Sequence, residues 1–548
     1  MTRRDWLLAL ATAQTPPWSL TDVTTAAGIR FQHNTGAFGS KYLPETMGPG
    51  CAFLDYDGDG WLDILLINGQ DWPGHPRRRS TLQLLRNNGN GTFRDVTRAA
   101  GLDVEMYGMG VAVGDFDNDG FPDLYITAVG QSRLFRNNRR GGFIDVTRAA
   151  GLAPRTGFST SALWFDYDRD GLLDLFVCNY VRWSPETDVR CSLDGAAKSY
   201  CTPEAYRGAT CWLFRNRGNG TFEDVTARAG LFDPSSKSLG VAMLDAGNDG
   251  WPDLFVANDT QPNKLYRNNR DGTFTESAVR MGVAFSEDGR ARAGMGVDVA
   301  DYRNNGQPAI AVTNFDNEMI GLYEPDKGGY LDRATERGIG AVSRDRLGFG
   351  CLFGDLNLDG YLDLIAVNGH IDDSVRNIGR RPSHAQVPHL FLNERGARFR
   401  DAATSVGAAF ASPKIARGLA LGDFDRDGDL DILLTTNGGA AYLYRNDLPN
   451  AHRSIRFVLE GRKSNRDAIG AVMHLHTAAG RQTQMVKSGS SYLSASALPL
   501  TFGVALLRDI QRAVVYWPSG HTQEAAKLVT GVTYHWVEGE SPKPLSHR

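Results

Sequence analysis

The sequence lacks both a long apolar run and an excess of charge of either sign. No stretch approaches the ~18 apolar residues of a membrane span, and 59 basic side chains stand against 63 acidic ones in 548 residues. Nucleophile elbows, zinc-ligand spacings, phosphate loops and nucleotide fingerprints are missing as well. We therefore expect no transmembrane segment and no nucleic-acid partner in a chain long enough to bury one or more large cores.

Cysteine is scarce too, with six residues. Cys191, Cys201 and Cys211 follow one another at ten-residue intervals in a polar segment, where a disulfide between Cys191 and Cys201 would staple a long loop. Cys51 and Cys351 occupy equivalent places in apolar strands, which is typical of small buried core residues. The pairing of Cys211 stays open.

The N-terminal segment "MTRRDWLLALATAQTPP" contains two arginines, an apolar stretch and then an Ala-Thr-Ala sequence. This order is typical of an export signal, and "TRRDWLL" resembles a twin-arginine signal with tryptophan in place of the usual phenylalanine. The apolar stretch is short, so an ordinary N-terminal tail is the alternative. We predict an export signal at residues 1–13 and a periplasmic or extracellular location.

Glycine is abundant, and the 62 glycines recur beside aspartate, which favours many short strands joined by turns. The clearest example is "GPGCAFLDYDGDGWLD", residues 48–63, which lies between two apolar strands. Seven similar copies make an internal repeat the dominant feature of the chain. The first aspartates of repeats 1 to 7 are Asp55, Asp115, Asp166, Asp245, Asp301, Asp355 and Asp423.

Two further signatures accompany the repeats. A segment of the "LFRN" type and a strand of the "GTFxDVT" type follow the copies, but repeat 7 stops at "LYRND" and lacks the second signature. The missing strand is found at the other end of the chain, in "WSLTDVTTAAGI", residues 18–29. This displacement is natural in a closed ring without unpaired edges. We predict an all-β fold with a seven-bladed β-propeller over residues 14–448, closed by the N-terminal strand, with a Cys-containing insertion at about 180–211.

The C-terminal residues 449–548 contain short alternating segments that predict a small β-rich domain. There, "NRDAIGAVMHLHT", "KSGSSYLSAS" and "WPSGHTQ" resemble an ASPIC/UnbV domain, and the repeats resemble FG-GAP/VCBS propeller repeats. The whole chain thus resembles the cartilage acidic protein group. This resemblance implies an extracellular, calcium-binding interaction protein, whereas UnbV-type relatives imply an enzyme that cyclises or alkylates a polyketide-like substrate. The shared motifs are structural, so the reaction is not carried over.

The aspartate spacing within a repeat suits a hard cation. Calcium takes six or more oxygen ligands, and a tight loop presents side chains 1, 3 and 5, carbonyl 7 and carboxylate 9 toward one point. An EF-hand would carry glutamate at position 12, but Leu66 stands there in repeat 1. The alternative is that the aspartates only cap turns. Clustered carboxylates repel one another, however, and repeating that cost in loop after loop favours a metal.

We predict about five structural calcium ions and no other cofactor. The ligand sets are Asp55, Asp57, Asp59, Trp61 and Asp63; Asp115, Asp117, Asp119, Phe121 and Asp123; Asp166, Asp168, Asp170, Leu172 and Asp174; Asp355, Asn357, Asp359, Tyr361 and Asp363; and Asp423, Asp425, Asp427, Asp429 and Asp431. Repeat 4 has Gly247 at position 3 and is doubtful. Repeat 5 has Arg303 at position 3 and Ala309 at position 9, so we expect no metal there and a pairing of Arg303 with Asp301 in its place.

A ligand site is expected at one mouth of the propeller channel, because variable loops gather there. Five asparagines share one register position, where they either satisfy turn backbones or form a polar rim. Irregular segments before and after them supply further polar side chains. The expected site residues are His33, Lys41, Tyr42, Glu45, Asn68, Asn179, Tyr180, Asn258, Asp259, Asn314, Asn368 and His370.

Two hypotheses for the function remain. The leading one is a monomeric binding module whose mouth recognises an unknown protein, carbohydrate or small molecule. The alternative is an enzyme acting at the same mouth on a small organic or polyketide-like substrate, with Glu45, His33, Asp259 and His370 as the first acid–base candidates.

Overall fold

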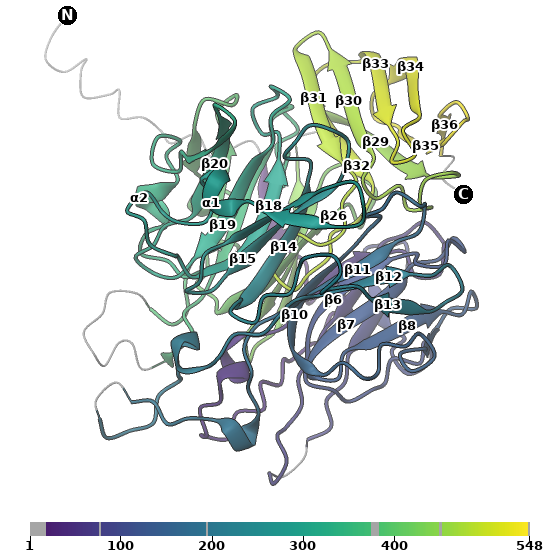
Figure 1. The fold of residues 1–548 in the computed structure, drawn as a ribbon. Helices are drawn as coiled ribbons and strands as arrows, with labels where there is room; N and C mark the ends of the chain where they lie inside the picture. Colours follow the sequence, from purple (N-terminus) through teal and green to yellow (C-terminus); the bar gives the residue numbers. More distant parts are fainter. Residues whose placement is uncertain (1–17, 76–77, 193–194, 374–382, 449–451, 546–548) are drawn as a thin grey trace, which may run out of the picture.

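The structure is a computed structural model that describes residues 18–75, 78–192, 195–373, 383–448 and 452–545 (Figure 1). The expected export signal, residues 1–13, lies outside these ranges. Regular structure in the described chain is almost entirely strand. The α-helices are the single turns α1 (Ala278–Met281) and α2 (Gly340–Ser343), and no described helix has the length and apolarity needed to cross a membrane.

Each of repeats 1 to 6 forms four antiparallel strands that follow one another in the chain. Repeats 1 to 3 contain β2 (Cys51–Leu54), β3 (Asp63–Leu66), β4 (Gln83–Asn87) and β5 (Phe93–Asp95); β6 (Gly108–Gly114), β7 (Asp123–Gly130), β8 (Arg133–Asn137) and β9 (Phe143–Asp145); and β10 (Gly157–Phe165), β11 (Asp174–Asn179), β12 (Trp212–Asn216) and β13 (Phe222–Asp224). The long β10 also pairs with β7, which joins repeats 2 and 3 into one continuous sheet.

Repeats 4 to 6 follow the same order. Their strands are β14 (Ser238–Leu244), β15 (Asp253–Asn258), β16 (Lys264–Asn268) and β17 (Phe274–Glu276); β18 (Gly294–Ala300), β19 (Ala309–Asn314), β20 (Gly321–Asp326) and β21 (Gly329–Asp332); and β22 (Gly348–Gly354), β23 (Asp363–Asn368), β24 (His389–Asn393) and β25 (Phe399–Asp401). Short 3-10 turns lie in the connections: η1 (Leu43–Thr46), η2 (Pro185–Thr187), η3 (Pro203–Ala205) and η5 (Ala403–Ser405).

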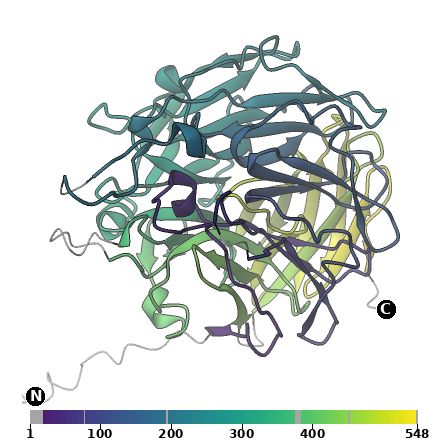
Figure 2. The same cartoon turned by 90° about the horizontal axis from the view of Figure 1, so that it is seen from below.

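Repeat 7 is completed by the N-terminal strand, as the sequence predicts. Its own strands are β26 (Ala416–Gly422), β27 (Asp431–Thr436) and β28 (Ala441–Asp447), and β1 (Ser19–Asp22) pairs with β28 from Ser19 opposite Asp447 to Asp22 opposite Tyr444. In Figure 2 the purple N-terminal strand lies beside the green strands of this repeat. The first strands of the repeats contact one another in chain order, and β2 contacts β26. The repeats therefore close into the ring of a β-propeller.

The inner strands are buried on both faces, because each is covered by its two neighbours in the ring. Strands β6, β14, β22 and β26 are buried at all seven positions. The sequence of a strand in that environment is a continuous run of apolar and small residues, such as "GMGVAVG" in β6. It does not alternate between apolar and polar residues. Cys51 and Cys351 belong to such strands and are buried free thiols, as predicted.

The C-terminal region forms two further four-stranded sheets. One contains β29 (Arg453–Glu460), β32 (Leu500–Ala505), β35 (Thr533–Val537) and β36 (Lys543–Pro544), and the other contains β30 (Val472–Thr477), β31 (Gly480–Met485), β33 (Asp509–Tyr516) and β34 (Thr522–Val529). Their core is continuous with the ring, since Trp536 of β35 and Trp164 of β10 lie in one buried cluster. Figure 1 shows these yellow-green sheets against one side of the propeller.

The segment between β31 and β32 runs into the ring and fills its centre. Backbone N–H groups of Phe53, Val111 and Val297 donate to carbonyls of Ala495, Leu493 and Ser491 at 3.0 to 3.1 Å, so the segment bonds to strands of repeats 1, 2 and 5. Glycine leaves the space that this segment needs: a Cβ on Gly50, directly before β2, would lie 1.8 Å from the Leu493 carbonyl oxygen. The propeller channel is therefore occupied by residues 487–497 of the same chain, which we call the central segment.

Candidate metal centres and channel mouth

Each aspartate loop connects the first two strands of its repeat and is stabilised from within. In repeat 1 the Asp55 carboxylate accepts a hydrogen bond from the Gly60 N–H at 2.8 Å, and Gly60 adopts the positive φ of 83° that the bend requires. Asp63 accepts from the N–H groups of Tyr56 at 3.0 Å and Asn87 at 2.8 Å. The carboxylates at positions 1 and 9 therefore accept hydrogen bonds from the backbone, in addition to any cation that they bind.

Four of the seven loops bring three carboxylates together. Their oxygen atoms lie within 4.8 Å of one another in the groups Asp55, Asp57 and Asp63; Asp115, Asp117 and Asp123; Asp166, Asp168 and Asp170; and Asp423, Asp425 and Asp431. In each group the position-3 carboxylate has a buried oxygen without a hydrogen-bond partner among the described residues: Asp57, Asp117, Asp168 and Asp425. Buried orphan carboxylate oxygens are costly without a counter-charge, so these four loops fit a cation.

The electrostatics agree with that fit. Burial raises the pKa of Asp63 to about 8, and the neighbouring Asp55 and Asp57 raise it further against the hydrogen bonds that lower it. Burial likewise raises the pKa of Asp55 to about 6 and that of Asp123 to about 9. All donors in the loops are oxygens, which suits calcium or magnesium, and a flexible set of five or more ligands favours calcium. Bound calcium would neutralise the clustered carboxylates.

The loops of repeats 4 to 6 differ at position 3. In repeat 6, Asn357 donates to Asp359 at 3.2 Å beside the buried Asp355. Repeat 4 has Gly247 at position 3, and its position-5 carboxylate, Asp249, pairs with Arg270 at 2.6 Å. These two loops do not bring together three carboxylates as the other four do.

The predicted pairing of Arg303 with Asp301 is wrong. The Arg303 guanidinium pairs with Glu324 at 3.0 Å, and Arg337 binds the same carboxylate at 2.6 Å. Asp301 instead accepts a backbone hydrogen bond from Gly306 at 2.7 Å, as Asp55 does in repeat 1. Position 1 faces its own backbone, so a side chain at position 3 reaches outward to the third strand of its repeat.

The C-terminal region covers the side of the ring on which the aspartate loops lie. The Asp467 carboxylate accepts from the Asp115 N–H at 2.7 Å, and Arg169 of repeat 3 donates to the Pro518 carbonyl at 2.7 Å. Arg456 of β29 pairs with Asp423 of repeat 7 at 2.5 Å. These contacts use residues inside or beside the candidate metal loops, so loop geometry and domain docking are coupled.

The five asparagines of the expected polar rim bind nearby backbone. The side-chain amides of Asn179, Asn258, Asn314 and Asn368 donate to carbonyls of the segments that follow them, at 2.7 to 2.9 Å. The Asn68 amide oxygen accepts from the Asn34 N–H at 2.8 Å. This is the geometry expected for asparagines that satisfy turn backbones.

The acid–base candidates lie at the mouth opposite the C-terminal sheets and are buried. Glu45, His33, Asp259 and His370 are 2 to 4% exposed. Tyr200 donates to Glu45 at 3.1 Å, and Tyr180 donates to Asp259 at 2.5 Å. Burial raises the pKa values of Glu45 and Asp259 to about 7 and lowers that of His33 to about 3. The rings of His33 and His370 accept backbone N–H groups at 3.0 and 3.1 Å, so each candidate has a protein partner, but Glu45 Oε1 and His370 Nε2 are buried without a hydrogen-bond partner among the described residues.

Aromatic side chains close the same mouth. Trp72 stacks on Tyr107 with ring centres 4.3 Å apart, and Trp183 meets the Tyr42 edge at 5.4 Å. Tyr492 of the central segment belongs to the same buried cluster. Lys41, the most accessible of the expected cations here, pairs with the exposed Asp373 at 3.0 Å. Side chains therefore close the mouth, and its accessible polar groups lie at the rim.

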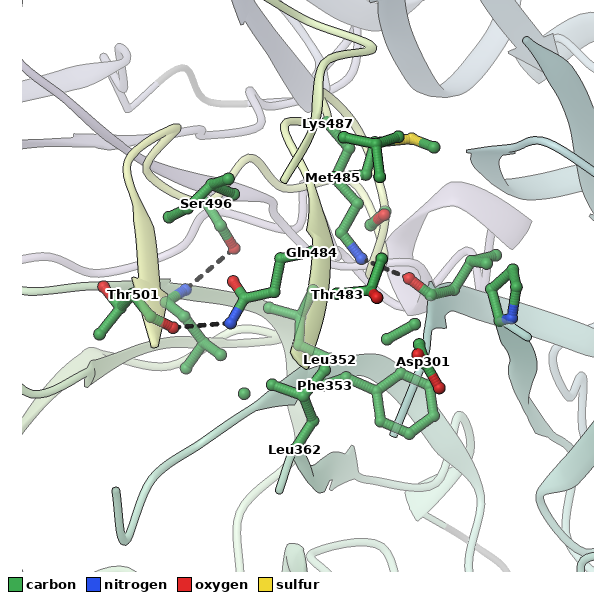
Figure 3. A pocket seen from close by; sticks show the side chains of 18 of the residues that line it. Asp301, Leu352, Phe353, Leu362, Thr483, Gln484, Met485, Lys487, Ser496 and Thr501 are labelled. Atoms are coloured by element: carbon green, nitrogen blue, oxygen red, sulfur yellow. Dashed lines mark hydrogen bonds between the residues drawn. The ribbon is translucent and has the colours of Figure 1, made fainter. Parts of the chain in front are cut away.

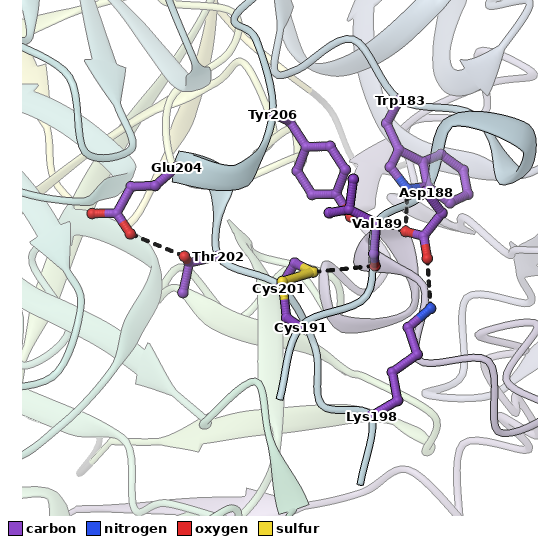
Figure 4. The surroundings of a disulfide bond; sticks show 9 residues. All are labelled: Trp183, Asp188, Val189, Cys191, Lys198, Cys201, Thr202, Glu204 and Tyr206. Atoms are coloured by element: carbon purple, nitrogen blue, oxygen red, sulfur yellow. Dashed lines mark hydrogen bonds and ion pairs between the residues drawn. A yellow bond between two sulfur atoms is a disulfide. The ribbon is translucent and has the colours of Figure 1, made fainter. Parts of the chain in front are cut away.

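The predicted disulfide between Cys191 and Cys201 is present and stabilises the insertion that forms part of this rim (Figure 4). Asp188 anchors the same loop, since it accepts from Trp183 at 2.9 Å and Tyr206 at 2.8 Å and pairs with Lys198 at 2.5 Å. Cys211 is a free, buried thiol that donates to Ser238 at 3.1 Å.

Sequence reasoning missed the buried Arg417 and the central segment. The Arg417 guanidinium is fully buried, lies 3.9 Å from the Phe349 ring centre and donates to carbonyls that include those of Thr46 at 2.7 Å and Gly369 at 3.0 Å. The glycines of the inner strands were the available signal for a backbone passing close to them, because glycine marks close approach.

Comparison with known proteins gives two family matches. A model described as FG-GAP-like repeat matches residues 55–126, 205–256 and 245–312, and a model described as ASPIC and UnbV matches residues 461–543. Cartilage acidic protein 1 of Xenopus tropicalis is 26% identical over 313 residues, which are 56% of this chain and 45% of that protein. The human protein of the same name is 31% identical over 168 residues, which are 29% of this chain and 24% of that protein.

The chain thus matches less than half the length of these curated relatives. Among solved structures, a chain described as YCF48 bound to D1 peptide aligns with a TM-score of 0.40 and 8% identity, covering 81% of this chain and 98% of that chain.

Proposed function

We propose that this chain, which combines FG-GAP-like repeats with an ASPIC and UnbV domain and is similar to cartilage acidic protein 1, is an exported binding module stabilised by calcium. In this proposal the aspartate loops hold the metal, the C-terminal sheets dock on those loops, and the opposite mouth of the propeller contacts a protein, a carbohydrate or a small molecule.

The observation that carries the calcium proposal is the orphan oxygen at position 3. It occurs in the four loops whose carboxylates converge, on Asp57, Asp117, Asp168 and Asp425. A hydrogen bond from a neighbouring residue would satisfy such an atom if the loop were only a turn. Calcium needs several oxygens at 2.3 to 2.6 Å, and carbonyl 7 together with water can complete the set.

The mouth opposite the C-terminal sheets is the proposed binding face. The face with the aspartate loops is covered by contacts such as Asp467 to Asp115, so it offers less free surface. The opposite rim is built from segments that differ between repeats, including the disulfide-stapled insertion. Variable loops on a rigid scaffold are where recognition usually lies. A disulfide also supports export, because such bonds persist in oxidising compartments.

The calcium proposal is tested by titrating metal-free protein with calcium in a calorimeter. Asp57→Ala removes one converging carboxylate, and Asp249→Ala is the matched control, because each substitution also removes one short ion pair with an arginine. We expect the number of bound ions to fall by one for Asp57→Ala and to stay unchanged for Asp249→Ala. Equal stoichiometry in both variants would contradict the assignment of this loop.

The binding face is tested with calcium-loaded protein on a glycan array and against peptides displayed on phage. Lys41→Glu changes the charge of the rim, and Lys327→Glu makes the same change on an exposed hairpin of repeat 5. We expect Lys41→Glu to lower the affinity for a captured ligand and Lys327→Glu to leave that affinity unchanged. Binding that survives Lys41→Glu but is lost when the C-terminal sheets are altered would place the site elsewhere.

A further inference from the structure

A cavity of about 220 Å³ lies between the propeller and the C-terminal sheets, on the side away from the proposed binding face. The propeller lines it with Leu352, Phe353 and Leu362, and the C-terminal region lines it with Met485 (Figure 3). Leu500 also belongs to the C-terminal wall. The two parts of the chain therefore form opposite walls of one space, and boundaries between domains are common places for small-molecule sites.

The walls contain apolar side chains that the fold does not cover fully. Met485 and Leu498 are only partly buried against the core of the C-terminal sheets. Leu362 and Leu430 are partly buried against the cores of repeats 5 to 7. Apolar groups at the centre of a domain boundary normally pack against each other, so side chains left partly open on both walls indicate room for an apolar occupant.

Polar groups around the cavity restrict the charge of that occupant. The Lys487 ammonium pairs with Asp298 and donates to the Val299 carbonyl at 2.8 Å, and Arg456 pairs with Asp423. Lys487 and Arg456 are therefore compensated, and Asp245, Asp301 and Asp355, which also line the cavity, accept hydrogen bonds from N–H groups of their own loops. An anionic ligand would have to break these pairs or lie uncompensated beside the lining carboxylates in a largely apolar space, which is costly. A cationic ligand would have to compete with the N–H groups and the arginine that already bind those carboxylates.

Two almost fully buried hydroxyl groups provide polar contacts. Ser490 and Thr501 are 3% and 4% exposed and line the cavity, and their hydroxyl oxygens have no hydrogen-bond partner among the described residues. The nearby Gln484 amide donates to the Thr501 carbonyl at 2.7 Å, which keeps that strand in place (Figure 3). A buried hydroxyl needs a partner, and a ligand with a hydroxyl or carbonyl group would supply one.

The volume indicates the size of the ligand. A dry apolar cavity of ~150 Å³ holds one benzene molecule, and the cavity here is about one and a half times as large. Water is a weaker candidate, since each buried water needs two to four polar partners and most of the wall is apolar. The space therefore suits a molecule of one ring with substituents, two fused rings, or a short branched aliphatic chain.

We propose that this cavity is a binding site for a neutral, mainly apolar small molecule with a hydroxyl or carbonyl group that pairs with Ser490 or Thr501. The site is independent of the proposed binding face and is composed of both parts of the chain. A ligand there connects the propeller to the C-terminal sheets, so its binding stabilises their association.

The test uses p-cresol as the polar probe and toluene as its apolar partner, added to the full, calcium-loaded chain. Calorimetry and thermal unfolding should show saturable binding of one p-cresol per chain and a rise in Tm. Leu498→Trp fills the cavity and should abolish both effects, whereas Leu506→Trp, at a position that is 67% exposed in the same domain, should leave them unchanged. Binding that is absent, or unaffected by Leu498→Trp, would overturn the proposal.

A second variant tests the polar contact and does not depend on filling the cavity. Thr501→Val keeps the shape and removes the unpartnered hydroxyl. Its p-cresol affinity should fall roughly 2- to 10-fold, the range of one neutral hydrogen bond, while toluene affinity should not fall. Crystals soaked with p-bromophenol then locate the probe by the anomalous signal of bromine. Ordered water throughout the cavity, or bromine found only elsewhere, would contradict the site.

Discussion

The aspartate loops of repeats 1 and 5 make the same turn, but the ion pair between position 3 and the third strand is reversed in sign. Both use the position-1 carboxylate to accept a backbone N–H five residues later, at 2.8 Å in repeat 1 and 2.7 Å in repeat 5. In repeat 1, Asp57 at position 3 pairs with Arg86 of β4. In repeat 5, Arg303 occupies position 3 and pairs with Glu324 of β20, which stands in the register place of Arg86.

This reversal separates turn formation from metal binding. Repeat 5 shows that one carboxylate at position 1 is sufficient for the turn, because the loop closes although Ala309 replaces the position-9 aspartate. The additional carboxylates of repeat 1 are therefore not needed to form the bend. They converge with an orphan oxygen on Asp57, whose other oxygen pairs with Arg86, and so could hold a cation. The two loops serve as each other's control within one chain.

Of the changes that test the comparison between repeats 1 and 5, removal of calcium should have the largest effect. Tenfold saturation of each of the four converging loops contributes ~1.4 kcal/mol per loop, so chelation should cost about 6 kcal/mol and lower Tm by about 5 °C in a chain of this length. Differential scanning calorimetry with and without EDTA measures it, and added excess calcium should restore the curve. An unchanged melting curve would mean that the repeat-1 carboxylates act without a metal.

A smaller effect is expected from breaking the reversed pair of repeat 5. Arg303→Asp would place a carboxylate beside the buried Glu324, whose side chain is 6% exposed, and should destabilise the chain by about 2 kcal/mol. The double variant Arg303→Asp with Glu324→Arg restores opposite charges and should recover about half of the loss, since Arg337 also loses its partner. Chemical denaturation of the single and double variants gives the coupling energy. Strictly additive changes would mean that the two residues do not act as a pair.

Much of this comparison can be read from the sequence, because the loop residues are local and recur in register. The position-3 substitutions, the N-terminal strand that completes repeat 7 and the Cys191–Cys201 disulfide were all predictable in this way. The partner of Arg303 was misassigned because Glu324 is 21 residues away. Aligning the third strands of the repeats would have found it, since Glu324 falls where Arg86 stands.

The channel and its mouth were less accessible to sequence reasoning. His33 and Glu45 have the right chemistry for a catalytic site, but pattern alone does not report that they are 4% and 2% exposed. The central segment lies more than 400 residues from the strand of repeat 1 that it contacts, as in the hydrogen bond from Phe53 to Ala495. Long-range contacts of this kind leave only indirect traces, such as Gly50 at the point of closest approach.

The comparison can be sharpened in repeat 6, where Asn357 stands at position 3 without an arginine in the register place of Arg86, which Leu392 occupies. Asn357→Asp would add a carboxylate beside the buried Asp355 and Asp363. We expect tighter calcium binding at this loop, because affinity rises with the charge of the ligand set, and lower stability of the metal-free form. Calcium titrations followed by calorimetry test both. A variant that is destabilised without calcium and gains nothing with calcium would rule out a metal in repeat 6.

The smallest effect concerns a buried carboxylate outside the loops, Glu45 at the mouth. Burial raises its pKa from 4.5 to about 7 in the folded chain, so the folded state holds a proton that the unfolded state has released above pH 4.5. The stability that depends on a protonated Glu45 is therefore fully present below pH 4.5. It is lost as the pH rises through 7, because the folded state must then bury a carboxylate or release it to water. Glu45→Gln, which keeps the shape and cannot ionise, should flatten the fall in stability between pH 5 and 8 when both chains are measured with saturating calcium. An unaltered pH profile in Glu45→Gln would show that the carboxylate is already neutralised by a partner, as the aspartates of repeat 1 are expected to be by calcium.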